Sequence, residues 1–101
     1  MTEMRLVRKI DEIGRIVLPR EMREYLGFTK RSYARVQLCD NHITLTKAEQ
    51  TDAILEIESI RKIDELGRVL LPKDMRDKLS WQVKEPIKIQ VTENALILEK
   101  V

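Results

Sequence analysis

The sequence is poor in the residues that supply cross-links, metal ligands and aromatic packing. Its 101 residues include one Cys, one His, three Gly and three Pro, and aromatic residues make up 4%. The single Cys39 excludes an intramolecular disulfide, and together with the single His42 it leaves no plausible cluster of metal ligands. We therefore expect no metal and no cofactor, and assign Cys39 and His42 no function.

The sequence also lacks a long apolar run. No segment approaches the roughly 18 apolar residues of a membrane span, and the first residues, MTEMRLVRK, carry no apolar signal-peptide region. We expect a cytoplasmic protein with no membrane partner. Charged residues make up 36% and hydrophobic residues 43%, a composition typical of a globular rather than a disordered chain.

Two parts of the chain nearly repeat each other. KIDEIGRIVLP starts at Lys9 and KIDELGRVLLP at Lys62, an offset of 62 − 9 = 53 that runs without a gap to Lys47 and Lys100 with 16 of 40 positions identical. This predicts an internal duplication, with copies at residues 1–48 and 53–101. A copy of about 50 residues buries too little surface to be stable alone, so we expect the two copies to form one domain.

Positive charge follows the repeated motif. The formal net charge is only +2, but residues 1–31 carry eight basic and five acidic residues, residues 32–59 two and five, and residues 60–101 nine and seven. The sums are +3, −3 and +2, so the segments that begin each copy are the basic ones.

Each copy is predicted to fold as β-β-α-β-β. In the first copy, MRLVRKI and RIVL are strands on either side of the turn DEIG, where Asp11 can bond its own backbone and Gly14 can adopt positive φ. Pro19 ends the second strand and begins a helix of about two turns that Gly27 stops. YARVQLC and HITLTK alternate with period two around the hairpin turn DN.

The second copy differs in detail. Ser80 replaces the glycine at the helix end, which predicts a weaker stop, and KEP at residues 84–86 predicts an extended lead into the strand IKIQV. Between the copies we expect a connection at Ala48–Asp52 and the next strand to begin at Ile54–Ser59. Within both copies Met22, Met75, Phe28, Tyr33 and Trp81 are predicted to pack in or against the core.

One copy has too few strands to close a core. Its hairpins would leave an apolar face and open edges, whereas eight strands from two copies could close into a small barrel with the hairpins of one copy paired with those of the other. The predicted fold class is therefore mainly β with two short helices.

The repeated motif resembles a known DNA-binding domain. VRKIDEIGRIVLPREMREYLGF and IRKIDELGRVLLPKDMRDKL are similar to the N-terminal domain of the AbrB/MazE/SpoVT family of transition-state regulators and antitoxins. The resemblance implies a swapped-hairpin β-barrel, formed here as an intrachain pseudo-dimer, that binds double-stranded DNA. The implied DNA-binding residues are Arg8, Lys9, Arg15 and Arg23 in the first copy and Arg61, Lys62, Arg68 and Arg76 in the second.

Elementary electrostatics points to the same residues. Arg8 and Arg15 flank one turn, so pairing across a hairpin would bring two guanidiniums together, which costs repulsion unless an anion such as phosphate lies between them. The alternative is that these arginines form salt bridges with Asp11, Glu12 or the helix acids as a solvated surface.

The acidic residues of the turns do not indicate an enzyme. Asp11 and Glu12, like Asp64 and Glu65, are adjacent carboxylates, but no His, nucleophilic Ser or metal site accompanies them. We expect them to form the turns and orient the arginines, and we expect no small-molecule substrate.

The sequence thus predicts a DNA-binding transcriptional regulator, expected to be a repressor, whose affinity depends strongly on salt and whose specificity derives mainly from DNA shape. Differences between the copies, such as Tyr25/Lys78 and Thr29/Gln82, would suit unequal half-sites. One alternative is an antitoxin, disfavoured because LILEKV at the end of the chain predicts a strand rather than an acidic tail. Another is a protein-interaction module that assembles with AbrB-like proteins, and self-association is also open.

Overall fold

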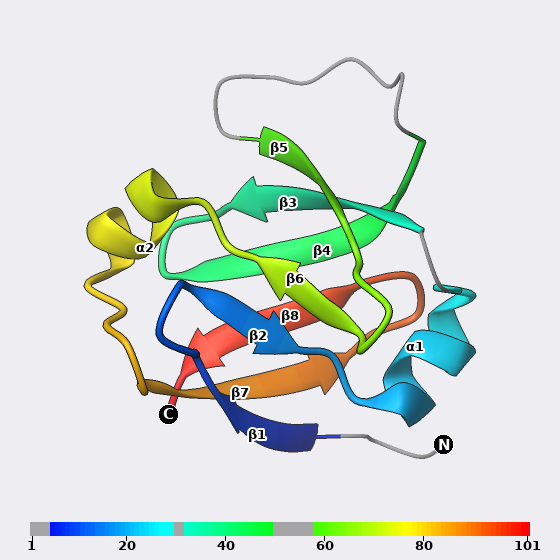
Figure 1. The fold of residues 1–101 in the computed structure, drawn as a ribbon, viewed down its shortest axis with the longest axis horizontal. Helices are drawn as coiled ribbons and strands as arrows, with labels where there is room; N and C mark the ends of the chain where they lie inside the picture. Colours follow the sequence, from blue (N-terminus) through cyan, green and yellow to red (C-terminus); the bar gives the residue numbers. More distant parts are fainter. Residues whose placement is uncertain (1–4, 30–31, 50–57) are drawn as a thin grey trace.

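The computed structural model describes residues 5–29, 32–49 and 58–101, which form strands and two short helices (Figure 1). The elements of the first half are β1 (Arg5–Lys9), β2 (Arg15–Val17), α1 (Arg20–Leu26), β3 (Tyr33–Leu38) and β4 (His42–Ala48). Those of the second half are β5 (Glu58–Lys62), β6 (Arg68–Leu70), α2 (Lys73–Leu79), β7 (Pro86–Val91) and β8 (Leu96–Lys100). The prediction of a mainly β chain with two short helices is confirmed.

The predicted joint between the copies is only partly described. Ala48 ends β4, Glu49 follows it, and Glu58 and Ser59 begin β5, whereas residues 50–57 lie outside the described residues. Across the described ranges, no helix is long and apolar enough to cross a membrane.

Six strands form one antiparallel sheet in the order β1-β7-β8-β4-β3-β5. Among the strands that the structure describes, β3–β4 and β7–β8 are the hairpins of this sheet, whereas β1 pairs with β7, β3 with β5 and β4 with β8. Figure 1 shows β1 beside β7 at one edge and β5 beside β3 at the other. Each edge strand therefore depends on the other half of the chain for its backbone hydrogen bonds.

The two remaining strands, β2 and β6, form a separate two-stranded antiparallel ribbon. Arg15 lies opposite Leu70, Ile16 opposite Val69 and Val17 opposite Arg68. The ladder continues into both turns, because Leu18 donates its amide to the Gly67 carbonyl at 2.8 Å and Leu71 donates to the Gly14 carbonyl at 3.0 Å.

The expected pairing across the first turn is wrong. The strands on either side of Asp11–Gly14 belong to different sheets, since β1 pairs with β7 and β2 with β6. Two backbone bonds close the turn itself, from the Asp11 amide to the Arg15 carbonyl at 2.8 Å and from the Gly14 amide to the Asp11 carbonyl at 3.1 Å. The turn redirects the chain from the sheet to the ribbon, so Arg8 and Arg15 do not face each other across a hairpin.

The core lies between the sheet and the ribbon, and most of its side chains are aliphatic. Ile16, Leu18, Val69 and Leu71 supply its ribbon side, and the inward positions of the sheet supply Val36, Ile43, Leu45, Ile87, Ile89, Leu96 and Leu98. Met22 and Met75 join it from the helices, and Phe28 and Trp81 are buried beside them, as expected. Tyr33 is half-buried.

Both helices end in the same way despite their different residues. Gly27 adopts φ 76° and Ser80 adopts φ 59°, and in each case the next residue donates to a carbonyl in the helix, Phe28 to Arg23 at 2.8 Å and Trp81 to Arg76 at 2.9 Å. Ser80 thus adopts a left-handed conformation that glycine adopts without strain, and the residue after each helix end, Phe28 or Trp81, is buried.

The expected extended conformation before β7 is wrong at Lys84. Its φ is 67°, and its amide donates to the Ile10 carbonyl at 2.7 Å. The Ile10 amide in turn donates to the Glu85 carbonyl at 3.1 Å, so a turn at this position carries the β1–β7 pairing one step further. The proline restricts only the residue directly before it, Glu85, which is why the sequence rule missed Lys84.

Candidate nucleic-acid interface

The outward face of the β2–β6 ribbon carries the central pair of predicted DNA-binding residues. Because side chains alternate along a strand and Ile16 and Val69 point inward, Arg15, Val17, Arg68 and Leu70 point outward. Arg15 and Arg68 are diagonal neighbours, a relation that places such residues about 7–8 Å apart. Both arginine side chains therefore start from neighbouring positions on one solvated face of the ribbon.

A turn carboxylate holds each of these arginines in place. Asp11 Oδ2 accepts a bond from Arg15 Nε at 2.7 Å, while its Oδ1 accepts the amides of Ile13 at 3.1 Å and Arg15 at 2.8 Å. The carboxylate therefore forms the turn and orients the arginine, as expected, and the predicted alternative of a salt bridge applies to Arg15.

The second turn reproduces this arrangement. Asp64 Oδ2 lies 2.6 Å from Arg68 Nε, and its Oδ1 accepts the amides of Leu66 at 2.9 Å and Arg68 at 2.8 Å. Arg15 and Arg68 keep 30% and 28% of their side-chain surface exposed. Over the described ranges, the terminal guanidinium nitrogens of both arginines are without a hydrogen-bond partner, so they are available to an external anion.

These contacts shift the pKa of both aspartates. Partial burial alone would raise the pKa of Asp11, but hydrogen bonds from the Arg15 amide, the Arg15 side chain and the Ile13 amide lower it further than burial raises it. The pKa of Asp64 is lowered for the same reasons by Arg68 and Leu66. Both carboxylates are ionised at neutral pH and remain bound to their arginines.

The helix arginines lie against the turn of the opposite copy. Arg23 Nε donates to the Leu18 carbonyl at 2.8 Å, and Arg76 Nε donates to the Leu71 carbonyl at 2.9 Å. A Cβ on Gly14 would lie 2.6 and 2.7 Å from the terminal nitrogens of Arg76, so only glycine lets the guanidinium approach so closely. Gly67 bears the same relation to Arg23, with a Cβ 2.7 Å from Nε.

Each end of the ribbon thus combines residues from both halves of the chain. Gly14 immediately precedes Arg15 and contacts Arg76, while Gly67 immediately precedes Arg68 and contacts Arg23. The sequence offered no signal for this combination, because it depends on how β2 and β6 cross.

The other four predicted residues lie on the edge strands. Arg8 and Lys9 end β1 and are exposed, and Arg8 donates from a terminal nitrogen to its neighbour Val7 at 2.9 Å. Arg61 and Lys62 hold the same positions in β5, where Arg61 Nε donates to Ser59 Oγ at 2.9 Å. These residues belong to the sheet rather than the ribbon.

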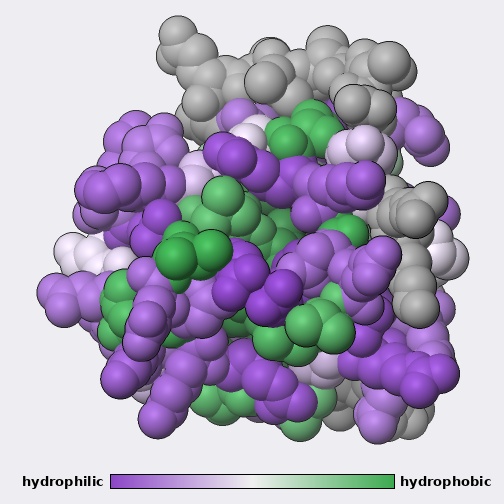
Figure 2. Space-filling view, viewed as in Figure 1, coloured by the Kyte–Doolittle hydropathy of each residue, from purple (hydrophilic) through white to green (hydrophobic). Residues whose placement is uncertain are grey.

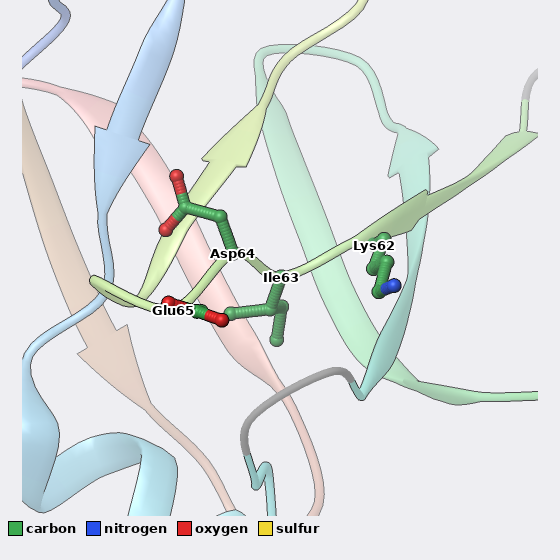
Figure 3. A pocket seen from close by; sticks show the side chains of 4 residues that line it. All are labelled: Lys62, Ile63, Asp64 and Glu65. Atoms are coloured by element: carbon green, nitrogen blue, oxygen red, sulfur yellow. The ribbon is translucent and has the colours of Figure 1, made fainter.

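A hollow of about 370 Å³ lies where β5 leads into the second turn, lined by Lys62, Ile63, Asp64 and Glu65. Figure 3 shows the side chains of Asp64 and Lys62 pointing in different directions. Since Asp64 is bound to Arg68, the hollow offers no free pair of carboxylates for acid–base chemistry. The described residues also contain no group of three or more His, Cys, Asp or Glu that could hold a metal ion.

Sequence reasoning missed four apolar side chains around the ribbon. Ile13 and Leu66 occupy the tips of the two turns, and Val17 and Leu70 alternate with the arginines on the outward face. Figure 2 shows hydrophobic surface set among hydrophilic surface over β2 and β6. The period-two pattern of RIVL and RVLL held a signal, because an inward Leu18 and Leu71 require an outward Val17 and Leu70.

Sequence comparisons match part of the chain to known proteins. Residues 60–101 match the family described as antidote-toxin recognition MazE, bacterial antitoxin. The chain is also 40% identical over 42 residues to the transition state regulatory protein AbrB of Bacillus subtilis (strain 168). That match covers 42% of this chain and 44% of the relative, so the chain spans less than half of the length of that protein.

The fold as a whole is similar to the solution structure of PHS018 from Pyrococcus horikoshii. The similarity has a TM-score of 0.57 at 21% identity and covers 96% of this chain and 92% of that one. At this identity the similarity concerns the fold alone. Both sequence matches are thus to proteins of the AbrB/MazE type.

Proposed function

We propose that this chain is a DNA-binding transcriptional regulator, built as an intrachain pseudo-dimer of two β-β-α-β-β repeats that together form one swapped-hairpin barrel. The name of its relative, a transition state regulatory protein, supports regulation. The register of the ribbon supports the pseudo-dimer because it is symmetric. Replacing each residue of the pair Arg15–Leu70 by the residue 53 positions away in the other half gives the pair Arg68–Val17, which is also present.

The observation that carries the proposal is the pair of arginines at the centre of the ribbon. Arg15 and Arg68 are held at Nε by Asp11 and Asp64, so little side-chain entropy remains to be lost when their terminal nitrogens bind. A guanidinium can bond phosphate oxygens or guanine edges through two parallel bonds. Arg23 and Arg76 add charge at the ends of the ribbon, and Arg8, Lys9, Arg61 and Lys62 extend the basic surface along the edge strands.

The test is a fluorescence-anisotropy titration of duplex DNA against the R15A/R68A variant at several salt concentrations. Each arginine that binds phosphate contributes about one unit to the slope of log K against log salt, so we expect the slope to fall by about two and the affinity to drop at least tenfold. The matched control is K47A/K100A, which removes the same charge from equivalent positions of β4 and β8. Equal losses of DNA affinity in both variants would mean that only the net charge of the protein matters. Unchanged DNA binding by R15A/R68A would refute the proposal.

An antitoxin is the second candidate, and the MazE family match to residues 60–101 favours it. Such a protein would bind a toxin in addition to DNA. Purification of the chain from its native host, followed by mass spectrometry of partners present in equal amounts, separates the two. A single stoichiometric partner that is toxic when expressed alone would establish the antitoxin, and its absence would leave the regulator.

A further inference from the structure

Four large apolar side chains are exposed on or beside the ribbon. The exposed fractions are 61% for Ile13, 66% for Leu66, 40% for Val17 and 36% for Leu70. They form two pairs of equivalent positions, 13 with 66 and 17 with 70, so both copies present the same apolar groups. The core does not use them, because Ile16 and Val69 already fill the inward face of the ribbon.

Arginines lie directly among these apolar groups. Val17 is opposite Arg68 and Leu70 is opposite Arg15, and the turn tips are two residues from the arginines that follow them. A partner for this face must therefore offer negative charge and small apolar groups at close spacing. The segments that carry the face have an excess of positive charge, which favours a polyanion over a protein surface.

The two-stranded form and short length of the ribbon suit the major groove of DNA. The ribbon is five residues long on each strand, from Gly14 to Leu18 and from Gly67 to Leu71. Three positions on each strand are paired, and one backbone bond at each end extends the ladder into a turn. Five residues of antiparallel strand span about 14 Å. The major groove is about 12 Å wide and admits a two-stranded ribbon, and its characteristic apolar group is the C5 methyl of thymine.

We propose that Ile13, Val17, Leu66 and Leu70 bind thymine methyl groups in the major groove while Arg15 and Arg68 bind the flanking phosphates or guanines. This inference rests on the proposed DNA binding. It adds a direct apolar contact with the bases to any preference that comes from DNA shape. A minor-groove complex would leave these side chains without methyl partners, since thymine presents only its O2 there.

The experiment compares two duplexes of the same A·T-rich sequence, one with thymine and one with deoxyuridine at every thymine position, which removes only the methyl groups. Burying one methyl is worth about fourfold in affinity at most. With several methyls in contact, we expect the wild-type chain to bind the thymine duplex at least tenfold more tightly. In I13A/L66A and V17A/L70A this ratio should fall toward one, because the thymine duplex loses more affinity than the deoxyuridine duplex does.

Two controls make the result specific. V7A truncates an exposed apolar side chain on β1, away from the ribbon, and should leave the ratio unchanged. A change in duplex shape caused by deoxyuridine would persist in I13A/L66A, whereas a methyl contact would not. Because all four side chains are exposed, the variants should unfold at the wild-type urea concentration within about 0.3 M.

The remaining outcomes overturn the inference in distinguishable ways. Equal binding of both duplexes by the wild type, with binding lost in R15A/R68A, would refute methyl contacts and leave the proposed regulator intact. No binding to any duplex at low salt would refute the proposed function and the inference together. A dimer in solution that I13A/L66A dissociates would assign the apolar groups to a second copy of the chain and overturn the inference.

Discussion

Replacing Gly14 by Ala tests the contact between the two copies at one end of the ribbon. Gly14 has φ 94°, a conformation that costs a residue with a Cβ about 1–2 kcal/mol. The new Cβ would also displace the Arg76 guanidinium and break the 2.9 Å bond from its Nε to the Leu71 carbonyl. A hydrogen bond from a charged group contributes about 1.5–3 kcal/mol. We therefore expect G14A to lower the free energy of unfolding by about 2.5–5 kcal/mol.

The two contributions separate in the R76A background. R76A already lacks the bond to Leu71, so adding G14A should cost only the 1–2 kcal/mol of the backbone, and the coupling energy should be about 1.5–3 kcal/mol. Urea unfolding of the four proteins, with equal slopes, measures this coupling.

G27A is the matched control for this cycle. Gly27 has φ 76°, but its Cβ would meet only Lys47 Nζ at 3.7 Å, an ordinary contact. We expect the same backbone cost of about 1–2 kcal/mol in both the wild-type and the R76A backgrounds. If G14A also cost the same in both, within about 0.5 kcal/mol, the contact between Arg76 and Gly14 would have no energetic role and the reasoning would be refuted.

Three further changes have expected outcomes. Because Asp11 and Asp64 have a lowered pKa in the folded state, their contribution to stability is present above the unfolded value of about 3.9 and is lost as pH falls below it. The D11N/D64N variant should thus lose less stability than wild type between about pH 5 and pH 2, as measured by urea titrations. Parallel curves of unfolding free energy against pH for the two proteins would contradict the lowered pKa of the aspartates. S80G should raise the melting temperature by a few degrees. Ser80 has φ 59°, a conformation that costs a residue with a Cβ about 1–2 kcal/mol, and the greater chain entropy of glycine offsets about 0.5–1 kcal/mol of that gain; a lower melting temperature would mean that chain entropy dominates. E58Q should destabilise by about 1–2 kcal/mol, because Glu58 is only 9% exposed and lies 2.8 Å from Arg35 Nη1; an unchanged urea midpoint would show that the ion pair is neutral.

The elements could be predicted from the sequence because their signals are local. Alternation located the strands, Pro19 and Pro72 located the starts of the helices, and the carboxyl groups of Asp11 and Asp64 identified the turns. Lys84 was missed because its left-handed conformation depends on a backbone bond to Ile10 in the other half of the chain.

Strand partners could not be predicted in the same way. Alternation says which side of a strand is buried but not which strand lies beside it, so Arg8 was placed opposite Arg15 although β1 pairs with β7. The close approach of Arg76 to Gly14 depends on that same crossing of the two copies. The basic residues themselves followed from the family resemblance, and their contact with DNA stays a prediction.

The pairing of β1 with β7 sets an order of events during protein synthesis. The two strands lie about 80 residues apart, and at about 5–20 residues per second several seconds pass between their emergence from the ribosome. Until then β1 has no partner for its backbone groups, and Leu6, which packs against the core, has nothing to cover it. During this time the first half of the chain has an unpaired strand edge, which can pair with the same segment of a neighbouring nascent chain. A ribosome that stalls midway would prolong that exposure.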